Sequence, residues 1–232
     1  MAAGGIEDIE KGLRVVNRRH FILSGTVAGF AGYWPLAQAQ VAASRKPLIL
    51  VVGDSLSAEY GLKRGEGWVP LLERRLAEQK IAATVVNASI SGDTTAGGRA
   101  RLAGLLSQHK PTHVVLELGG NDALRGLSLA GTEDNLTQMT KAAQAAGAEV
   151  LIVGIQVPPN YGSDYTRRFE AIFAKVASST KAALVPFLLK GVADGPEAAT
   201  LFQPDRIHPT AAAQPRMLDN VWPALRKLLA SR

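Results

Sequence analysis

A serine and a histidine near opposite ends of the chain are the residues best suited to do chemistry together. Ser55 lies in the segment Gly-Asp-Ser-Leu (53–56), directly after the apolar run 47–52. A buried strand that ends in a small residue and a serine places a hydroxyl at the rim of a sheet. If a helix follows, unpaired N–H groups surround that hydroxyl. The sequence therefore predicts nucleophilic serine catalysis.

A serine nucleophile needs a base, and His208 is the best candidate among four histidines. His20 lies in the N-terminal segment. His109 and His113 flank the start of the third predicted strand, at the opposite end of the sheet from Ser55. His208 is therefore expected to take the serine proton.

Asp205 is expected to orient this histidine. It precedes His208 by three residues on a turn, so its carboxylate can reach Nδ1 and stabilise the imidazolium. Asp194 and Asp219 are the competing carboxylates. The spacing favours Asp205.

The oxyanion that forms on attack needs positioned donors. Three are available: the backbone N–H groups of Ser55 and Gly92, and the side-chain amide of Asn121. Each residue also has a structural alternative. Ser55 could cap a helix, Gly92 could supply only its backbone angles, and Asn121 could brace its own loop.

Composition excludes several other kinds of site. The chain has no cysteine, which rules out disulfides, thiolate metal sites and a cysteine nucleophile. The net charge is +6, but the basic residues are spread along the chain and alternate with acidic ones. Nucleic-acid binding is therefore not expected. The predicted chemistry needs no metal or organic cofactor. A monomer is the expectation.

Short apolar runs alternate with helical patterns after residue 46, which predicts one α/β domain over 47–232 with a parallel sheet in a three-layer sandwich. The expected strands are 47–53, 83–87, 113–118, 149–155 and 183–186. The expected helices are 68–79, 95–109, 132–146, 164–180 and 211–229. Thr132 is expected to cap the third helix and Gly147 to end it. The loops that follow the first four strands are rich in Gly, Asn and Ser, and in such a sheet they share one site.

The first 39 residues have the features of an export signal. Arg18 and Arg19 precede a moderately apolar stretch, and Ala37-Gln38-Ala39 offers small residues for a signal peptidase. The paired arginines favour a twin-arginine leader, followed by a linker at 40–46. An ordinary secretory leader and an uncleaved anchor are the alternatives. The apolar stretch is too short for a stable membrane span. A periplasmic or secreted protein is expected.

Four sequence blocks in order resemble those of the SGNH, or GDSL, hydrolases. They are 53–56 (Gly-Asp-Ser-Leu), Gly92, 119–122 (Gly-Gly-Asn-Asp) and 205–209 (Asp-Arg-Ile-His-Pro). Longer stretches at 53–61, 86–94 and 117–126 resemble the bacterial periplasmic esterases with acyl-CoA thioesterase, lysophospholipase and arylesterase activities. The resemblance covers roughly residues 46–229.

The resemblance implies a flavodoxin-like sheet of five parallel strands in the order 2-1-3-4-5. It implies Ser55 as nucleophile with Asp205 and His208 as partners, and an oxyanion hole of Ser55, Gly92 and Asn121. Acyl esters, thioesters and lysophospholipids are the implied substrates. Arg206 departs from the pattern, because a small residue, often glycine, is expected between the aspartate and the histidine.

Two other functions stay open at this point. A carbohydrate deacetylase would use the same residues on acetylated sugars. A non-catalytic flavodoxin-like binding module would leave the polar residues at the strand ends unexplained, and the chain lacks a phosphate-binding glycine motif.

Overall fold

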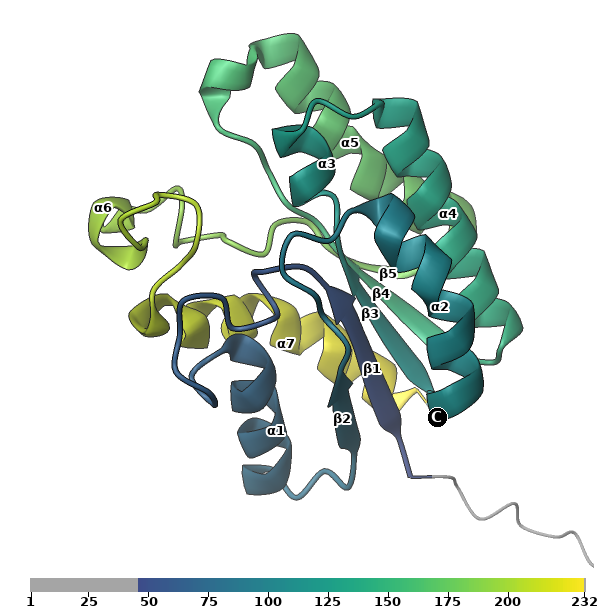
Figure 1. Cartoon of the computed structure of the whole chain (residues 1–232). Coiled ribbons are helices and arrows are strands. Elements are labelled where there is room, and N and C mark those ends of the chain that lie inside the picture. The colour runs from purple at the N-terminus through teal and green to yellow at the C-terminus, as the bar shows by residue number, and fades with distance from the viewer. Residues whose placement is uncertain (1–45, 232) are drawn as a thin grey trace, which may run out of the picture. The chain divides into compact units, whose positions relative to one another are not determined.

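Five parallel strands form one sheet in the order β2-β1-β3-β4-β5 in the computed structural model, which describes residues 46–231 (Figure 1). The predicted fold class and strand order are confirmed. Every predicted strand is present, with each end within two residues of its predicted position. The strands are β1 (Leu48–Gly53), β2 (Thr84–Asn87), β3 (His113–Glu117), β4 (Glu149–Val153) and β5 (Ala183–Val185).

Helices cover both faces of the sheet, as a parallel sheet requires. α1 and α7 pack together on one face, and α2, α4 and α5 form the layer on the other (Figure 1). The long helices are α1 (Trp68–Glu78), α2 (Thr95–His109), α4 (Leu129–Ala145), α5 (Ser163–Thr180) and α7 (Gln214–Ala230). The short ones are α3 (Gly120–Leu124), α6 (Ala198–Leu201) and the 3₁₀ turns η1 (Pro159–Tyr161) and η2 (Ala211–Ala213).

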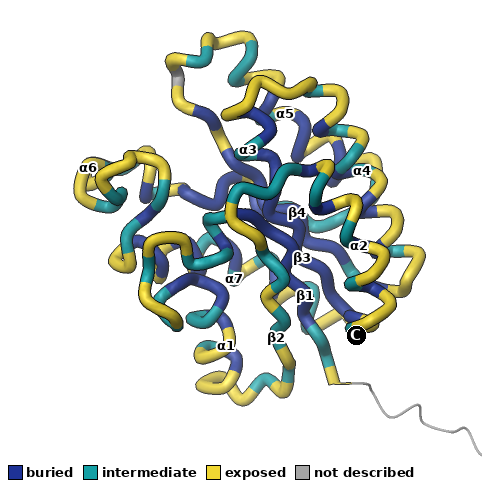
Figure 2. The backbone as a smooth tube through the Cα atoms, in the orientation of Figure 1, coloured by how far each residue is buried: buried dark blue, intermediate teal, exposed yellow. Residues whose placement is uncertain are grey.

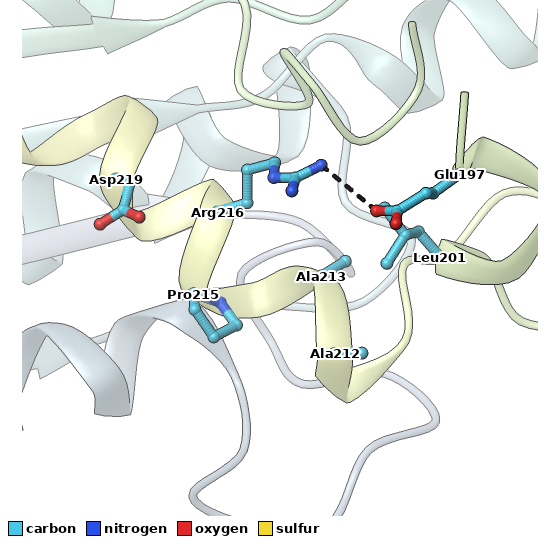
Figure 3. Close-up of a pocket in the computed structure, with 7 residues that line it drawn as sticks. All are labelled: Glu197, Leu201, Ala212, Ala213, Pro215, Arg216 and Asp219. Atoms are coloured by element: carbon cyan, nitrogen blue, oxygen red, sulfur yellow. Dashed lines mark ion pairs between the residues drawn. The ribbon is translucent and has the colours of Figure 1, made fainter. Parts of the chain in front are cut away.

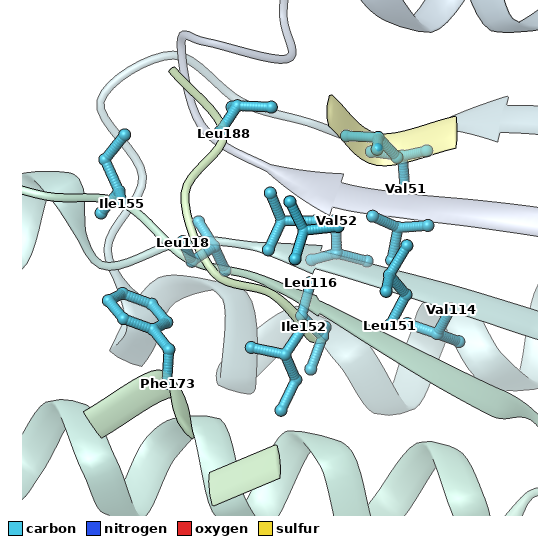
Figure 4. Close-up of a cluster of buried hydrophobic side chains, with 14 of the residues drawn as sticks. Val51, Val52, Val114, Leu116, Leu118, Leu151, Ile152, Ile155, Phe173 and Leu188 are labelled. Atoms are coloured by element: carbon cyan, nitrogen blue, oxygen red, sulfur yellow. The ribbon is translucent and has the colours of Figure 1, made fainter. Parts of the chain in front are cut away.

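The three inner strands explain why the apolar runs of the sequence lack polar alternation. Val52, Leu116 and Ile152 lie side by side in register across β1, β3 and β4, and all three are fully buried. Phe173 of α5 belongs to the same buried cluster (Figure 4). Both faces of these strands exclude water, whereas the edge strand β2 is partly exposed (Figure 2). This buried centre holds the ends of β1 and β3 in fixed positions.

Two helix starts differ from the prediction by three residues. α4 begins at Leu129, three residues early, because the Ser128 hydroxyl accepts the N–H of Gly131 and caps the helix. Thr132, the predicted cap, lies inside the helix and donates to Asp122. The predicted end at Gly147 is confirmed, with φ of +82° in the turn that follows. The last predicted helix starts as the 3₁₀ turn η2 and becomes α-helical at Gln214.

The predicted leader, residues 1–39, and all but the last residue of the predicted linker 40–46 lie outside the described residues. Within residues 46–231, no helix has the length and apolar character needed to cross a membrane.

Candidate active site

The predicted site residues meet at the carboxyl edge of the sheet. Ser55 follows β1, Gly92 follows β2, and Asn121 lies in α3 directly after β3. His208 and Asp205 come from the segment that joins α6 to η2. Strand order therefore brings together residues from distant parts of the chain, as expected for a parallel α/β sheet.

Ser55, His208 and Asp205 form an unbroken line of hydrogen bonds. The distance from Ser55 Oγ to His208 Nε2 is 2.9 Å, and from His208 Nδ1 to Asp205 Oδ2 it is 2.7 Å. The histidine side chain is 16% exposed, and the Tyr60 ring lies over it with 4.3 Å between ring centroids. The arrangement can move a proton from the serine to the imidazole while the carboxylate fixes the other nitrogen.

Asp205 is held in this position by its own loop. Its Oδ1 accepts the backbone N–H groups of Ile207 at 2.9 Å and His208 at 3.0 Å, while Oδ2 faces the imidazole. The backbone N–H of His208, then its side chain, then the Ile207 N–H lower the pKa of Asp205 to about 2. Asp205 is therefore ionised at every pH at which the protein would work.

Arg206 has φ of +58°, in the left-handed region that glycine adopts freely. This explains why a small residue is expected between the aspartate and the histidine. An arginine keeps the same turn at a cost of about 1–2 kcal/mol. The departure noted in the sequence thus leaves the contact between Asp205 and His208 intact.

Ser55 does not cap a helix, and no helix begins there. Residues 55–60 form consecutive turns, in which the N–H groups of Ser57 and Ala58 donate to the Asp54 carbonyl. α1 starts only at Trp68, with Gly67 as its N-cap. No helix follows the turn, so the condition for helical N–H groups around the Ser55 hydroxyl is not met, and Ser55 does not cap a helix.

Two of the three predicted oxyanion donors are unpaired backbone groups. Within residues 46–231, neither the Ser55 N–H nor the Gly92 N–H has a hydrogen-bond acceptor. Gly92 has φ of +79°, which a residue with a side chain rarely adopts. Its carbonyl accepts a hydrogen bond of 2.7 Å from Arg125, and Arg101 holds the same loop through Asp93 at 2.8 Å. The loop is fixed while its N–H stays available.

Unlike the two backbone donors, the Asn121 amide already forms hydrogen bonds. Its amide nitrogen already donates to Asp54 Oδ2 at 3.1 Å and to the Asp93 carbonyl at 2.9 Å. An amide carries two N–H donors, so both are occupied. The amide braces the loops after β1 and β2, and binding an oxyanion requires it to share one of these hydrogen bonds.

Two buried carboxyl groups, Asp54 and Glu117, lie beside the Ser55 turn, and Glu117 was not predicted from the sequence. Its Oε2 accepts the hydroxyl of Ser57 at 2.7 Å, and that hydroxyl accepts Trp68 Nε1 at 3.2 Å. Asp54 lies next to it, with its backbone N–H 3.5 Å from Glu117 Oε2. Glu117 could have been singled out because it is a charged residue at the end of a strand whose preceding residues are apolar.

Burial makes both carboxyl groups harder to ionise. Burial raises the pKa of Glu117 well above its ordinary value, and the neighbouring Asp54 raises it further. Burial also raises the pKa of Asp54, to about 6, against the opposing effects of the Leu56 N–H and the Asn121 amide. The pKa shifts therefore favour the protonated form of Glu117, and Asp54 ionises more readily than Glu117.

Glu117→Gln should make the protein relatively more stable as the pH rises. A raised folded-state pKa means that the stabilisation is complete below the unfolded-state pKa and is lost as pH rises through the folded-state pKa. Gln keeps the shape of the protonated acid and cannot ionise. The melting temperature of the variant minus that of the wild type should grow from pH 5 to pH 9, by about 2–4 °C for each kcal/mol.

Glu73→Gln, at an exposed position of α1, is the matched control. A difference in melting temperature that stays constant across this pH range for Glu117→Gln would show that Glu117 is ionised in the folded protein.

A hollow of about 400 Å³ lies between α6 and the start of α7 (Figure 3). Its wall includes the ion pair of Arg216 with Glu197, at 4.0 Å. Neither Ser55 nor His208 lines it. It is separate from the cluster of hydrogen bonds at Ser55.

Comparison with known proteins gives a family. The chain matches the sequence profile of the GDSL-like lipase/acylhydrolase family over residues 51–215. Esterase TesA of Pseudomonas aeruginosa is 54% identical over 181 residues, which are 78% of this chain and 89% of that protein. Thioesterase 1/protease 1/lysophospholipase L1 of Escherichia coli strain K12 is 42% identical over 181 residues, 78% of this chain and 84% of that protein.

A solved structure agrees with these relatives. The crystal structure of the psychrotrophic esterase EstA from Pseudoalteromonas sp., inhibited by monoethylphosphonate, has a TM-score of 0.75 at 40% identity. The match covers 80% of this chain and all of that one. On the profile match and these relatives, the chain belongs to the GDSL-like lipase/acylhydrolase family, the family of the SGNH hydrolases.

Proposed function

We propose that this protein is a serine esterase that hydrolyses acyl esters and thioesters through an acyl-enzyme on Ser55. The observation that carries the proposal is the line of hydrogen bonds from Asp205 through His208 to Ser55, at 2.7 Å and 2.9 Å. A serine, an imidazole and an ionised carboxylate in this order are the elements of nucleophilic acyl transfer.

In acylation, Ser55 Oγ attacks the ester carbonyl carbon while His208 Nε2 takes the hydroxyl proton. The tetrahedral oxyanion accepts the free N–H groups of Ser55 and Gly92, and a shared N–H of Asn121. His208 then gives its proton to the leaving alcohol or thiol as the bond to that group breaks. Asp205 stabilises the imidazolium without taking its proton.

In deacylation, water replaces the departed alcohol. His208 takes a proton from the water as its oxygen attacks the acyl carbon, and the same donors hold the second oxyanion. Collapse of this intermediate breaks the bond to Ser55 Oγ, and His208 returns the proton to the serine. The products are the free acid and the original enzyme.

The substrate classes follow from the relatives. One is named an esterase, and another a thioesterase, protease and lysophospholipase. We therefore propose acyl esters, aryl esters, acyl-CoA thioesters and lysophospholipids as substrates of this chain. A panel of p-nitrophenyl esters from C2 to C16, acyl-CoA, lysophospholipid and acetylated xylan tests this. Turnover of xylan alone would support a carbohydrate deacetylase, and no turnover at all would support a binding module.

Asn121→Ala should lower kcat by about 10²–10³ and leave KM little changed. The amide stabilises the oxyanion, which exists only after attack, so its loss affects the reaction more than substrate binding. The measurement is kcat and KM on one soluble acyl ester, together with the melting temperature. An unchanged kcat, with a lower melting temperature or a higher KM, would identify Asn121 as a loop brace only.

We also propose that residues 1–39 are an export signal cleaved after Ala39, and that the domain at 47–232 acts in the periplasm or outside the cell. Arg18, Arg19 and the Ala-Gln-Ala site support this. The N-terminal mass of exported protein tests the cleavage position. Continued export after both arginines are changed to Lys would favour the general secretory route.

A further inference from the structure

Arg101 lies beside the loop that carries one of the predicted oxyanion donors. It belongs to the second turn of α2, the helix that packs over β1 (Figure 1). A helical side chain points back toward the start of its own helix, so the Arg101 side chain reaches the loop 88–94 that precedes α2. The side chain is 21% exposed.

The Arg101 guanidinium forms hydrogen bonds to three separate parts of this edge of the sheet. Its Nε donates to Asp93 Oδ2 at 2.8 Å, Nη1 donates to the Ala88 carbonyl, and Nη2 donates to the Gly53 carbonyl at 3.4 Å. Ala88 directly follows β2, and Gly53 ends β1 two residues before Ser55. The planar guanidinium holds its donors in a rigid fork, so one side chain fixes the ends of β1 and β2 relative to Asp93.

Asp93 connects Arg101 to two of the three predicted oxyanion donors. Its carbonyl accepts the Asn121 amide at 2.9 Å, and its backbone directly follows Gly92. Its own N–H donates to the Ile90 carbonyl at 3.0 Å, which closes the loop into a turn. A displacement of Asp93 would therefore move the Gly92 N–H and the Asn121 amide together.

Close packing at Gly97 keeps the Asp93 carboxylate against Arg101. A Cβ atom at position 97 would overlap Asp93 Oδ1, so only glycine leaves room for the carboxylate beside α2. The same oxygen accepts the N–H of Thr94 at 2.9 Å. The carboxylate is thus held from the helix, from the backbone and from the guanidinium.

We propose that Arg101 is a positioning residue for the oxyanion hole, acting through Asp93 on Asn121 and Gly92. Oxyanion stabilisation depends on donors that are in place before the charge forms, and a displacement of about 1 Å can cost about 10²-fold in rate. The inference rests on the proposed esterase function. A wild type without hydrolysis would contradict that function, whereas an active wild type with equally active Arg101 variants would contradict this inference alone.

Arg125 holds the same loop from the solvent side and should contribute less. It donates to the Gly92 carbonyl at 2.7 Å, but its side chain is exposed. The Arg101 and Asp93 side chains are only 21% and 12% exposed, and a hydrogen bond is stronger where water is largely excluded. We therefore expect a larger loss of kcat from Arg101→Met than from Arg125→Met.

Arg101→Met keeps the apolar part of the side chain and removes its donors. It should lower kcat on a soluble acyl ester about 10²-fold and leave KM little changed. Arg99→Met is the matched control, because Arg99 lies on the same helix and pairs with Asp134 of α4 at 2.7 Å, with its side chain 45% exposed. The control should keep the kcat of the wild type. A raised KM at unchanged kcat in Arg101→Met would rule out a role in the oxyanion hole.

Stoichiometric labelling by an alkyl phosphonate separates positioning from a loss of folded protein. Each chain of Arg101→Met should still take up one phosphonyl group on Ser55, but more slowly, because the phosphonyl oxygen needs the same donors as the oxyanion. The opposite result would be fewer labelled chains with a wild-type kcat for each labelled chain. Arg101 would then stabilise only the fold, and the proposal would be wrong.

A double variant tests the route from Arg101 to Asn121. Residues that act through one another have effects that do not add. Arg101→Met should therefore lower kcat by no more than about tenfold when Asn121→Ala is already present, compared with about 10²-fold in the wild type. An equal factor in both backgrounds would show that Arg101 does not act through Asn121 and would overturn the proposal.

Two further variants decide the question if Arg101→Met does not fold. Arg101→Lys keeps the charge but loses the rigid fork, and Gly97→Ala displaces the Asp93 carboxylate while Arg101 stays in place. Each should lower kcat about tenfold with KM little changed. Gly104→Ala is the control for the second, because a Cβ at this position of α2 meets nothing within 4 Å. Wild-type kcat in both Arg101→Lys and Gly97→Ala would refute the positioning role.

Discussion

Ser55→Ala is expected to lower kcat for a soluble acyl ester by about 10⁶-fold, the size of loss seen when a serine nucleophile is removed from a triad. The hydroxyl forms the bond to the acyl carbon, and no other group in the site can take its place. Only binding and oxyanion stabilisation remain in the variant. Hydrolysis of p-nitrophenyl butyrate measures the loss.

Labelling by an alkyl phosphonate identifies the nucleophile independently of turnover. The wild type should gain the mass of one phosphonyl group on the peptide that contains Ser55, and Ser55→Ala should gain none. Ser91→Ala, in the exposed loop next to Gly92, is the matched control and should label and turn over like the wild type. Label on Ser57 or Ser91 would contradict the assignment.

Asp205→Asn is expected to lower kcat by about 10⁴-fold with the loop intact. Asn keeps an oxygen where Oδ1 accepts the N–H groups of Ile207 and His208, so the turn is retained. Its NH₂ replaces Oδ2 and donates to His208 Nδ1. The imidazole then carries its proton on Nε2 and cannot accept the proton of Ser55.

The pH dependence separates this effect from simple misfolding. Asp205 has a pKa of about 2, so the wild type has its carboxylate charged across pH 6–9 and loses this support only in strong acid. The measurement is kcat across that range for both proteins. Asp194→Asn is the control, because Asp194 was an alternative to Asp205 as the carboxylate that orients His208. More than a tenth of wild-type activity in Asp205→Asn would make Asp205 a loop brace only.

The sequence predicts most of the strands and helices, because each depends on a local pattern of residues. Apolar runs without polar alternation marked all five strands, and alternation with helices gave a parallel sheet. The end of α4 at Gly147 was predictable because a left-handed residue favours glycine. The start of α4 was not, because Ser128 and Thr132 are equally good caps by residue type. Only the contact of Thr132 with Asp122 shows which one is used inside the fold.

The candidate residues at the strand ends were also predictable, whereas their hydrogen-bond partners were not. Glu117 and Ser57 lie 60 residues apart, so no local pattern shows that the Ser57 hydroxyl donates to Glu117. The same holds for Asn121, whose two amide donors are taken by Asp54 and by the Asp93 carbonyl. Residue type shows that an amide can donate. Only the packing of three loops shows how many donors are left.

The hydrogen bonds at His208 span very different distances along the chain. Asp205 lies three residues away, so that half of the site can form within a single turn. Ser55 lies 153 residues away, and its contact requires β1 to be paired and α7 to be docked. Contacts of long sequence separation form slowly, because loop closure costs entropy before they can form. In refolding, hydrolytic activity should therefore return only when the complete fold has formed, after the individual helices and strand pairs.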